Sequence, residues 1–152
     1  MSSKKRYAVV GTGNRARGYI TALADEYRDV ADLVAFCDAS PTRIAAYNEL
    51  LAQEYGTAEI PGYSPDDFDR MVREQKPDTV IVTTTDATHH IYVVRAMELD
   101  CDVICEKPLT TDADKANQIL KAKEQSGRDL TVTFNMRYNP KVFTVKRLLR
   151  EG

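Results

Sequence analysis

The amino-acid sequence predicts a three-layer α/β/α fold, in which helices cover both faces of a doubly wound parallel sheet. Three observations predict it. Apolar runs of strand length alternate with helical patterns along the whole chain. The first of these runs leads directly into a glycine-rich turn. No linker, repeat or low-complexity tract interrupts the 152 residues, so we expect one domain over 1–152.

Each expected element is a periodic or apolar segment bounded by residues typical of a turn or a helix end. Pro41 suits the first position of one helix, Gly56 its end, and Pro77 blocks another helix from continuing. The expected strands are 5–10, 32–37, 79–84, 102–106 and 130–135, with a very short strand within 60–63. The expected helices are 14–26, 41–54, 64–75, 88–99, 111–125 and 140–150.

Composition narrows the class of protein. The hydrophobic content of 43% and charged content of 29% are typical of a globular domain, and a net charge of −2 argues against a nucleic-acid partner. No apolar run approaches the roughly 18 residues that cross a bilayer, and no signal peptide is recognisable, so we expect a cytoplasmic protein without a membrane partner. Three cysteines, Cys37, Cys101 and Cys105, are expected to be buried, reduced and free of metal.

The turn after the first strand has the pattern Gly11-x-Gly13-x-x-Ala16. Gly11 allows a tight turn, Gly13 lets the backbone approach a pyrophosphate, and the small Ala16 lets the next helix pack closely on the sheet. The helix start would present free N–H groups to a dinucleotide's negative charge. The expected cofactor-binding residues here are Gly11, Thr12, Gly13, Asn14 and Arg15.

Asp38 supports the same interpretation from the end of the second strand. It lies 20 residues beyond Gly18, near the spacing at which an acid contacts the adenosine ribose. A carboxylate there accepts hydrogen bonds from the ribose hydroxyls and repels a 2′-phosphate, so we expect NAD in preference to NADP. Arg43 could counter that preference by turning towards the phosphate. The alternative makes both glycines ordinary turn residues and Asp38 a helix cap.

Ligands of such sheets bind outside the carboxyl ends of the strands, which directs attention to two further segments. Thr83, Thr84 and Thr85 would lie across the phosphate and ribose, although threonines after a strand also serve as helix caps. Glu106 and Lys107 follow the fifth strand, and a partly desolvated lysine beside a cofactor can exchange a proton. Glu106 would orient that lysine. The alternative is an exposed surface lysine.

With these residues placed, the chain resembles the glucose–fructose oxidoreductase/inositol dehydrogenase (Gfo/Idh/MocA) family over essentially its whole length. The Glu-Lys-Pro at 106–108 is the most specific element. Residues 84–89 resemble the family's Thr-Pro-Asn-x-x-His turn, with Thr85 in place of proline, and the segment beginning at Asn135 resembles the one after its sixth strand. The resemblance adds Asn135 and His89 to the expected cofactor site and makes Lys107 the expected catalytic residue. For His89 a packing role is the alternative.

The family implies an amino-terminal NAD(P)-binding Rossmann domain followed by an α/β domain that selects the substrate. Members oxidise or reduce a hydroxyl carbon, usually of a sugar, cyclitol or related compound. The second domain, with its further proton-transfer residues, is absent from this sequence. We therefore expect an excised domain of a dehydrogenase, with a natural short remnant as the alternative. We expect the domain to be inactive alone and the complete protein to form a homo-oligomer.

Two other functions stay open. One is an NAD-dependent glycosidase of the same superfamily, for which cofactor retained through purification and glycoside cleavage would be evidence. The other is a non-catalytic dinucleotide-binding regulatory module. An Asp-x-x-x-His helix in a downstream sequence would favour either enzyme over the module.

Overall fold

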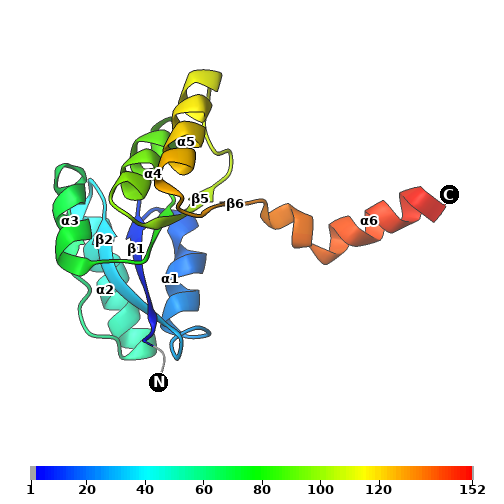
Figure 1. The fold of residues 1–152 in the computed structure, drawn as a ribbon. Coiled ribbons are helices and arrows are strands. Elements are labelled where there is room, and N and C mark those ends of the chain that lie inside the picture. Colours follow the sequence, from blue (N-terminus) through cyan, green and yellow to red (C-terminus); the bar gives the residue numbers. More distant parts are fainter. Residues whose placement is uncertain (1–2, 152) are drawn as a thin grey trace.

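A computed structural model describes residues 3–151 of the chain. Six strands form one sheet in the order β3-β2-β1-β4-β5-β6, and every neighbouring pair is parallel (Figure 1). The doubly wound sheet that the sequence predicts is thus confirmed. The strands are β1 (Lys5–Val10), β2 (Ala31–Cys37), β3 (Gly62–Tyr63), β4 (Thr79–Val82), β5 (Asp102–Glu106) and β6 (Leu130–Thr133).

Helices connect the strands, and three of them begin with a single 3₁₀ turn. The α-helices are α1 (Arg17–Ala24), α2 (Pro41–Tyr55), α3 (Phe68–Gln75), α4 (His89–Glu98), α5 (Ala113–Ser126) and α6 (Pro140–Glu151). The 3₁₀ turns are η1 (Asn14–Ala16), η2 (Pro65–Asp67), η3 (Asp86–Thr88) and η4 (Asn135–Tyr138). Every expected element exists, but β4 and β6 each end two residues earlier than predicted.

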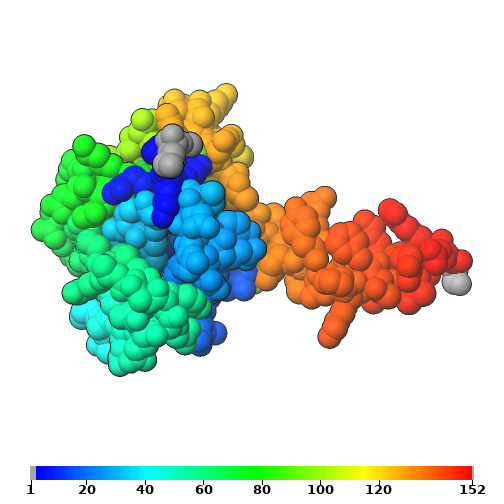
Figure 2. All heavy atoms as spheres, turned by 90° about the horizontal axis from the view of Figure 1, so that it is seen from below, coloured from blue at the N-terminus to red at the C-terminus, as the bar shows by residue number. Residues whose placement is uncertain are grey.

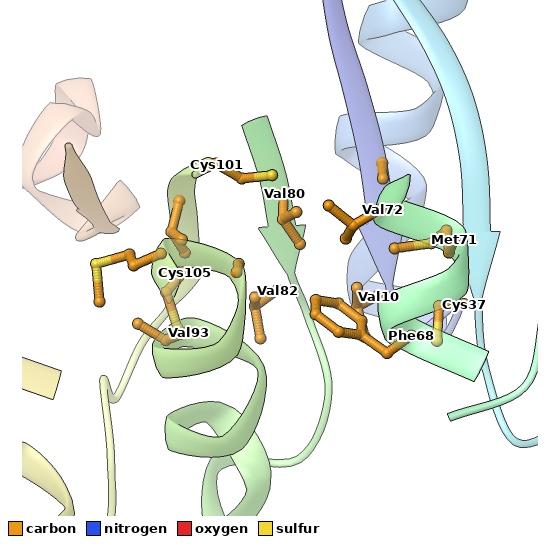
Figure 3. Close-up of a cluster of buried hydrophobic side chains, with 14 of the residues drawn as sticks. Val10, Cys37, Phe68, Met71, Val72, Val80, Val82, Val93, Cys101 and Cys105 are labelled. Carbon is orange, nitrogen blue, oxygen red and sulfur yellow. The ribbon is translucent and has the colours of Figure 1, made fainter. Parts of the chain in front are cut away.

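Alternate strand residues face opposite sides of the sheet, which produces two separate cores. Val80 and Val82 belong to the core beneath α3, α4 and α5, where Phe68, Met71 and Val93 also pack (Figure 3). Ile81, between the two valines, belongs instead to the core beneath α1 and α2. Burial on both faces explains why the strands read as continuous apolar runs.

The layer on the α1 face is incomplete. α1 and α2 cover β1 and β2, whereas α6 extends away from the body of the molecule (Figures 1 and 2). No residue of α6 is buried. On this face Ile104 of β5 is only partly buried and Thr131 of β6 is exposed.

The strand order changes direction between β1 and β4, so the chain leaves these two neighbouring strands towards opposite faces of the sheet. A crevice forms at the carboxyl ends of strands at such a point. Within residues 3–151, no helix is both long enough and apolar enough to cross a membrane.

Candidate functional site

A groove of about 320 Å³ opens at this point of the sheet. It collects the residues that follow β1, β2 and β4, although these lie far apart in the sequence. Most of the residues expected to bind a cofactor line it. The lining consists of Val10, Gly11, Gly13, Asn14, Arg15, Cys37, Asp38, Ala39, Arg43, Pro65, Thr83, Thr84, Thr85 and Tyr92.

Gly11 is required by the backbone itself. Its φ of +86° lies in the left-handed region, and a Cβ there would stand 2.7 Å from the backbone nitrogen of Thr84. The Thr83 hydroxyl donates to the Gly11 carbonyl at 2.6 Å. The turn after β1 therefore lies directly against the turn after β4, and only glycine allows this contact.

Gly13 differs because nothing in the described chain lies within 4 Å of the position its Cβ would take. Its φ of −76° is open to any residue, so the fold does not require glycine here. The N–H groups of Gly13, Asn14 and Arg15 meet no acceptor in the part of the chain described. Open space beside unpaired N–H groups at a helix start is what a pyrophosphate needs.

Asp38 lies on the β2 side of the same groove, with its side chain only 5% exposed. Its Oδ2 accepts from the Thr12 N–H at 2.6 Å and from the Thr12 hydroxyl at 3.0 Å. Its Oδ1 accepts from the Ser40 N–H at 2.7 Å. Arg43 approaches Oδ2 to 3.5 Å. One lone pair of Oδ1 remains for a ligand hydroxyl, whereas Thr12 has both donors committed to positioning Asp38.

The three threonines after β4 take different positions. Thr83 is buried, and its hydroxyl bonds to the turn after β1. Thr84 and Thr85 line the groove and are not buried, with the Thr84 hydroxyl accepting from Thr88 at 3.0 Å. The Thr88 hydroxyl also donates to the Thr85 carbonyl at 2.8 Å, so this turn is capped by Thr88.

Glu106 is buried, and both oxygens of its carboxylate accept hydrogen bonds from the protein. Its Oε1 accepts from Tyr19 at 2.6 Å and Thr133 at 3.0 Å, and the Arg15 guanidinium lies 2.7 Å away. Burial alone would raise the pKa of this carboxyl, but these hydrogen bonds hold that pKa below its usual value. Glu106 thus ties α1 to β6 as an anion.

Lys107 is exposed, and its ammonium group contacts no acceptor in the described chain. Glu106 does not pair with that ammonium group; instead its Oε2 accepts from the Lys107 N–H at 3.2 Å. The glutamate therefore fixes the backbone from which the lysine projects. The Lys107–Pro108 peptide bond is cis.

His89 lies behind the groove, with only 1% of its surface exposed. Its Nδ1 is 2.9 Å from the carbonyl oxygen of Pro108, and its Nε2 is 3.1 Å from the carbonyl oxygen of Thr84. The ring thereby joins the turn after β4 to the turn after β5. Its contacts in this structure are those of a packing residue.

Asn135 stands in η4 beyond the end of β6, is exposed, and does not line the groove. The groove also contains Tyr92 and Pro65, which the sequence analysis did not select. Tyr92 lies one helical turn beyond His89 on α4, so the helical period offered a signal for it. Pro65 follows the two-residue β3, where no motif marks the strand end.

The cysteines are buried and free, as expected. Burial raises the pKa of Cys37 and of Cys105 to about 12, and that of Cys101 to about 11. These thiols are therefore inert packing groups at neutral pH. Among residues 3–151, no cluster of three or more His, Cys, Asp or Glu side chains is arranged to hold a metal ion.

Comparison with known proteins gives consistent matches. The family model described as "Oxidoreductase family, NAD-binding Rossmann fold" matches residues 5–134. Inositol 2-dehydrogenase of Rubrobacter xylanophilus is 34% identical over 99% of this chain, and D-glucoside 3-dehydrogenase of Escherichia coli is 30% identical over 90% of it. The WlbA dehydrogenase of Chromobacterium violaceum, crystallised with NADH and UDP-GlcNAcA, superposes with a TM-score of 0.79 at 28% identity.

These matches extend over a minor part of each relative. The chain spans 41% of the Rubrobacter enzyme, 36% of the Escherichia coli enzyme and 41% of the WlbA chain, while 99% of this chain is covered in that superposition.

Proposed function

Since this chain belongs to the Gfo/Idh/MocA oxidoreductase family with an NAD-binding Rossmann fold, we propose that it is the cofactor domain of an NAD-dependent dehydrogenase of carbohydrate-like alcohols. One observation carries the proposal: the same groove contains open space beside the Gly13 backbone and an Asp38 carboxylate oxygen that can accept a further hydrogen bond. The relatives and neighbours named above act on or bind inositol, a glucoside and a nucleotide sugar.

In this proposal the residues divide into binding and positioning groups. The N–H groups of Gly13, Asn14 and Arg15 bind the pyrophosphate, and Asp38 accepts from the adenosine ribose. Thr84 and Thr85 contact the cofactor from the β4 side. Thr12 positions Asp38, and Glu106 fixes the backbone of Lys107. Five other residues predicted at the cofactor site lie outside the groove lining: Thr12, His89, Glu106, Lys107 and Asn135.

Lys107 is the proposed proton-transfer residue. A bound nicotinamide supplies hydride transfer, while the protein orients the partners and handles the hydroxyl proton. Lys107 follows β5 at the same sheet edge as the groove, and its ammonium group has no partner among residues 3–151. It would accept the proton of the substrate hydroxyl in oxidation and return it in reduction.

The test compares the complete protein, its Lys107→Ala variant and this 152-residue chain across a panel of sugars and cyclitols. We expect NADH formation by the complete protein, a loss of about 10²–10⁴-fold in kcat for the variant, and no turnover by the chain alone. The NAD affinity of the variant should change little, because the groove residues hold the cofactor. Lys107→Arg serves as a control, because its guanidinium keeps the positive charge but does not release a proton near neutral pH.

Two outcomes contradict the proposal. Substrate-dependent turnover by the 152-residue chain would overturn the two-domain assignment, and full activity of Lys107→Ala would remove that residue from the mechanism. We also propose a cytoplasmic location, which the three buried, free cysteines support. We also propose a homo-oligomer for the complete protein, which size-exclusion chromatography with light scattering would test.

A further inference from the structure

The uncovered half of the α1 face contains a second and larger groove, separate from the proposed cofactor site for most of its length. It encloses about 560 Å³ beside α1, over β1, β4 and β5. Its lining is mainly apolar, and two large side chains in it are conspicuously exposed, Tyr27 at 48% and Val30 at 63%. A doubly wound sheet normally buries both faces under helices. This groove is therefore a place where a helix is missing.

α6 is a helix that lacks a surface to pack on. Val142, Val145, Leu148 and Leu149 follow one another at helical spacing and form one apolar stripe, 38–80% exposed. Lys146, Arg147 and Arg150 project from the remaining circumference, together with Phe143, which is 56% exposed. An amphipathic helix of this kind obtains its stability by burying the stripe.

We propose that α6 of the same chain folds back about η4 and docks into this groove, completing the layer of α1 and α2. α6 is the nearest candidate to occupy the groove, because only a short segment, η4 and Asn139, separates it from the end of β6. Its 12 residues span about 18 Å, close to the length of the strands beneath. Laid over β4 and β5, it would fill the part of this face that α1, which contacts β2, leaves open.

Charge supports the same placement. α1 follows β1 and the docked α6 would follow β6, so both helices would run from the carboxyl edge of the sheet to its amino edge. The end of α6, with Lys146, Arg147 and Arg150, would then arrive beside the segment after α1. That segment carries the exposed acids Asp25, Glu26 and Asp29. Leu148 and Leu149 would meet Tyr27 and Val30, which are the exposed apolar residues of the same segment.

Disulfide trapping in the 152-residue chain tests the docking without any cofactor. Val30→Cys is combined with Leu149→Cys on the stripe, or with Arg147→Cys on the opposite side of α6 as the matched control. The native cysteines are buried and stay unreactive under mild oxidation. We expect an intramolecular disulfide in most monomers of the Leu149→Cys pair and a several-fold lower yield for the Arg147→Cys pair.

Each other outcome overturns the proposal. A disulfide between two chains, with a dimer by light scattering, would assign the groove to α6 of a second copy. Equal yields for the two pairs, or no disulfide in either, would show that α6 does not dock. A second measurement avoids engineered thiols: Leu149→Gln should lower the Tm by several degrees and increase binding of an apolar dye, while Arg147→Gln should do neither. Equal effects of these two variants would likewise contradict docking.

Discussion

At the scale of single residues, the two glycines of the first turn have separate physical roles. Gly11 is fixed by a positive φ and by contact with the Thr84 backbone, whereas Gly13 borders open space. We expect Gly13→Val to retain the circular dichroism spectrum of the parent chain and to lose NADH binding. Gly11→Ala is the matched variant. It should instead lower the free energy of unfolding by several kcal/mol, because the added Cβ would clash with the Thr84 backbone and alanine would have to adopt a positive φ.

Fluorescence titration with NADH and chemical denaturation separate these two effects. If folded Gly13→Val bound NADH with unchanged enhancement, the phosphate-binding turn would be misassigned. If Gly11→Ala were as stable as the parent, the contact between the two turns would be wrong.

We predict that Asp38 governs which dinucleotide binds. We expect the chain to bind NAD(H) more tightly than NADP(H), because the ionised Asp38 would face the 2′-phosphate across a short gap. Asp38→Ala should narrow the difference in Kd, and Arg43→Ala should widen it by removing the neighbouring positive charge. Calorimetry with both cofactors measures this directly. Equal or tighter NADP binding by the parent chain would refute the role of Asp38.

Glu106 makes stability depend on pH in a defined direction. Its pKa is lower in the folded chain than the ordinary glutamate value of about 4.3, so it stabilises the fold above that pH. This contribution is lost as the pH falls through the folded-state pKa. We expect Glu106→Gln to be less stable than the parent at pH 7, and the difference to shrink as the pH falls from 5 towards 3.

Denaturant unfolding at several pH values tests this, with Glu124→Gln, an exposed glutamate on α5, as the control. A difference between parent and Glu106→Gln that is constant with pH would show that the Glu106 charge is not what stabilises the fold.

At the scale of elements, His89 connects the turns that follow two paired strands, β4 and β5, beyond the point where their pairing ends. Its ring lies between the carbonyl oxygens of Thr84 and Pro108. We expect His89→Phe, which keeps an aromatic ring and removes both nitrogens, to lower the free energy of unfolding by about 1–3 kcal/mol. His90→Phe is the neighbouring control, because its Nδ1 has no hydrogen-bond partner. Equal losses in the two variants would contradict a bridging role for His89.

A strand or helix was predictable from the sequence where the residues within it, or at its ends, favour that structure by themselves. The run Thr79–Val82 is apolar and β-branched, Gly56 adopts the left-handed helix end expected of it, and both are found as predicted. The ends of β4 and β6 were not predictable. Thr83 is β-branched like a strand residue, but its hydroxyl donates to the Gly11 carbonyl in the turn after β1.

At the scale of the whole molecule, the doubly wound sheet and a ligand site at the carboxyl ends of its strands were predictable from the glycine turn and the alternation of elements. The buried polar network of Tyr19, Glu106 and Thr133 could not be predicted from the sequence. Tyr19 and Glu106 are 87 residues apart, and Thr133 is a further 27 residues along, so no spacing rule could join them. The direction of α6 was equally hidden, because an amphipathic stripe indicates that a helix packs without saying on which surface.

The bonds between the ends of β1, β2 and β4 also bear on how fast a ligand binds. Gly11 donates its N–H to the Cys37 carbonyl at 2.8 Å, and Thr83 donates its N–H to the Val10 carbonyl at 2.9 Å. Both walls of the groove are therefore fixed by main-chain atoms before any ligand arrives. We therefore expect a dinucleotide to bind without selecting a rare conformer, at an association rate set by encounter and orientation rather than by a rearrangement of the protein.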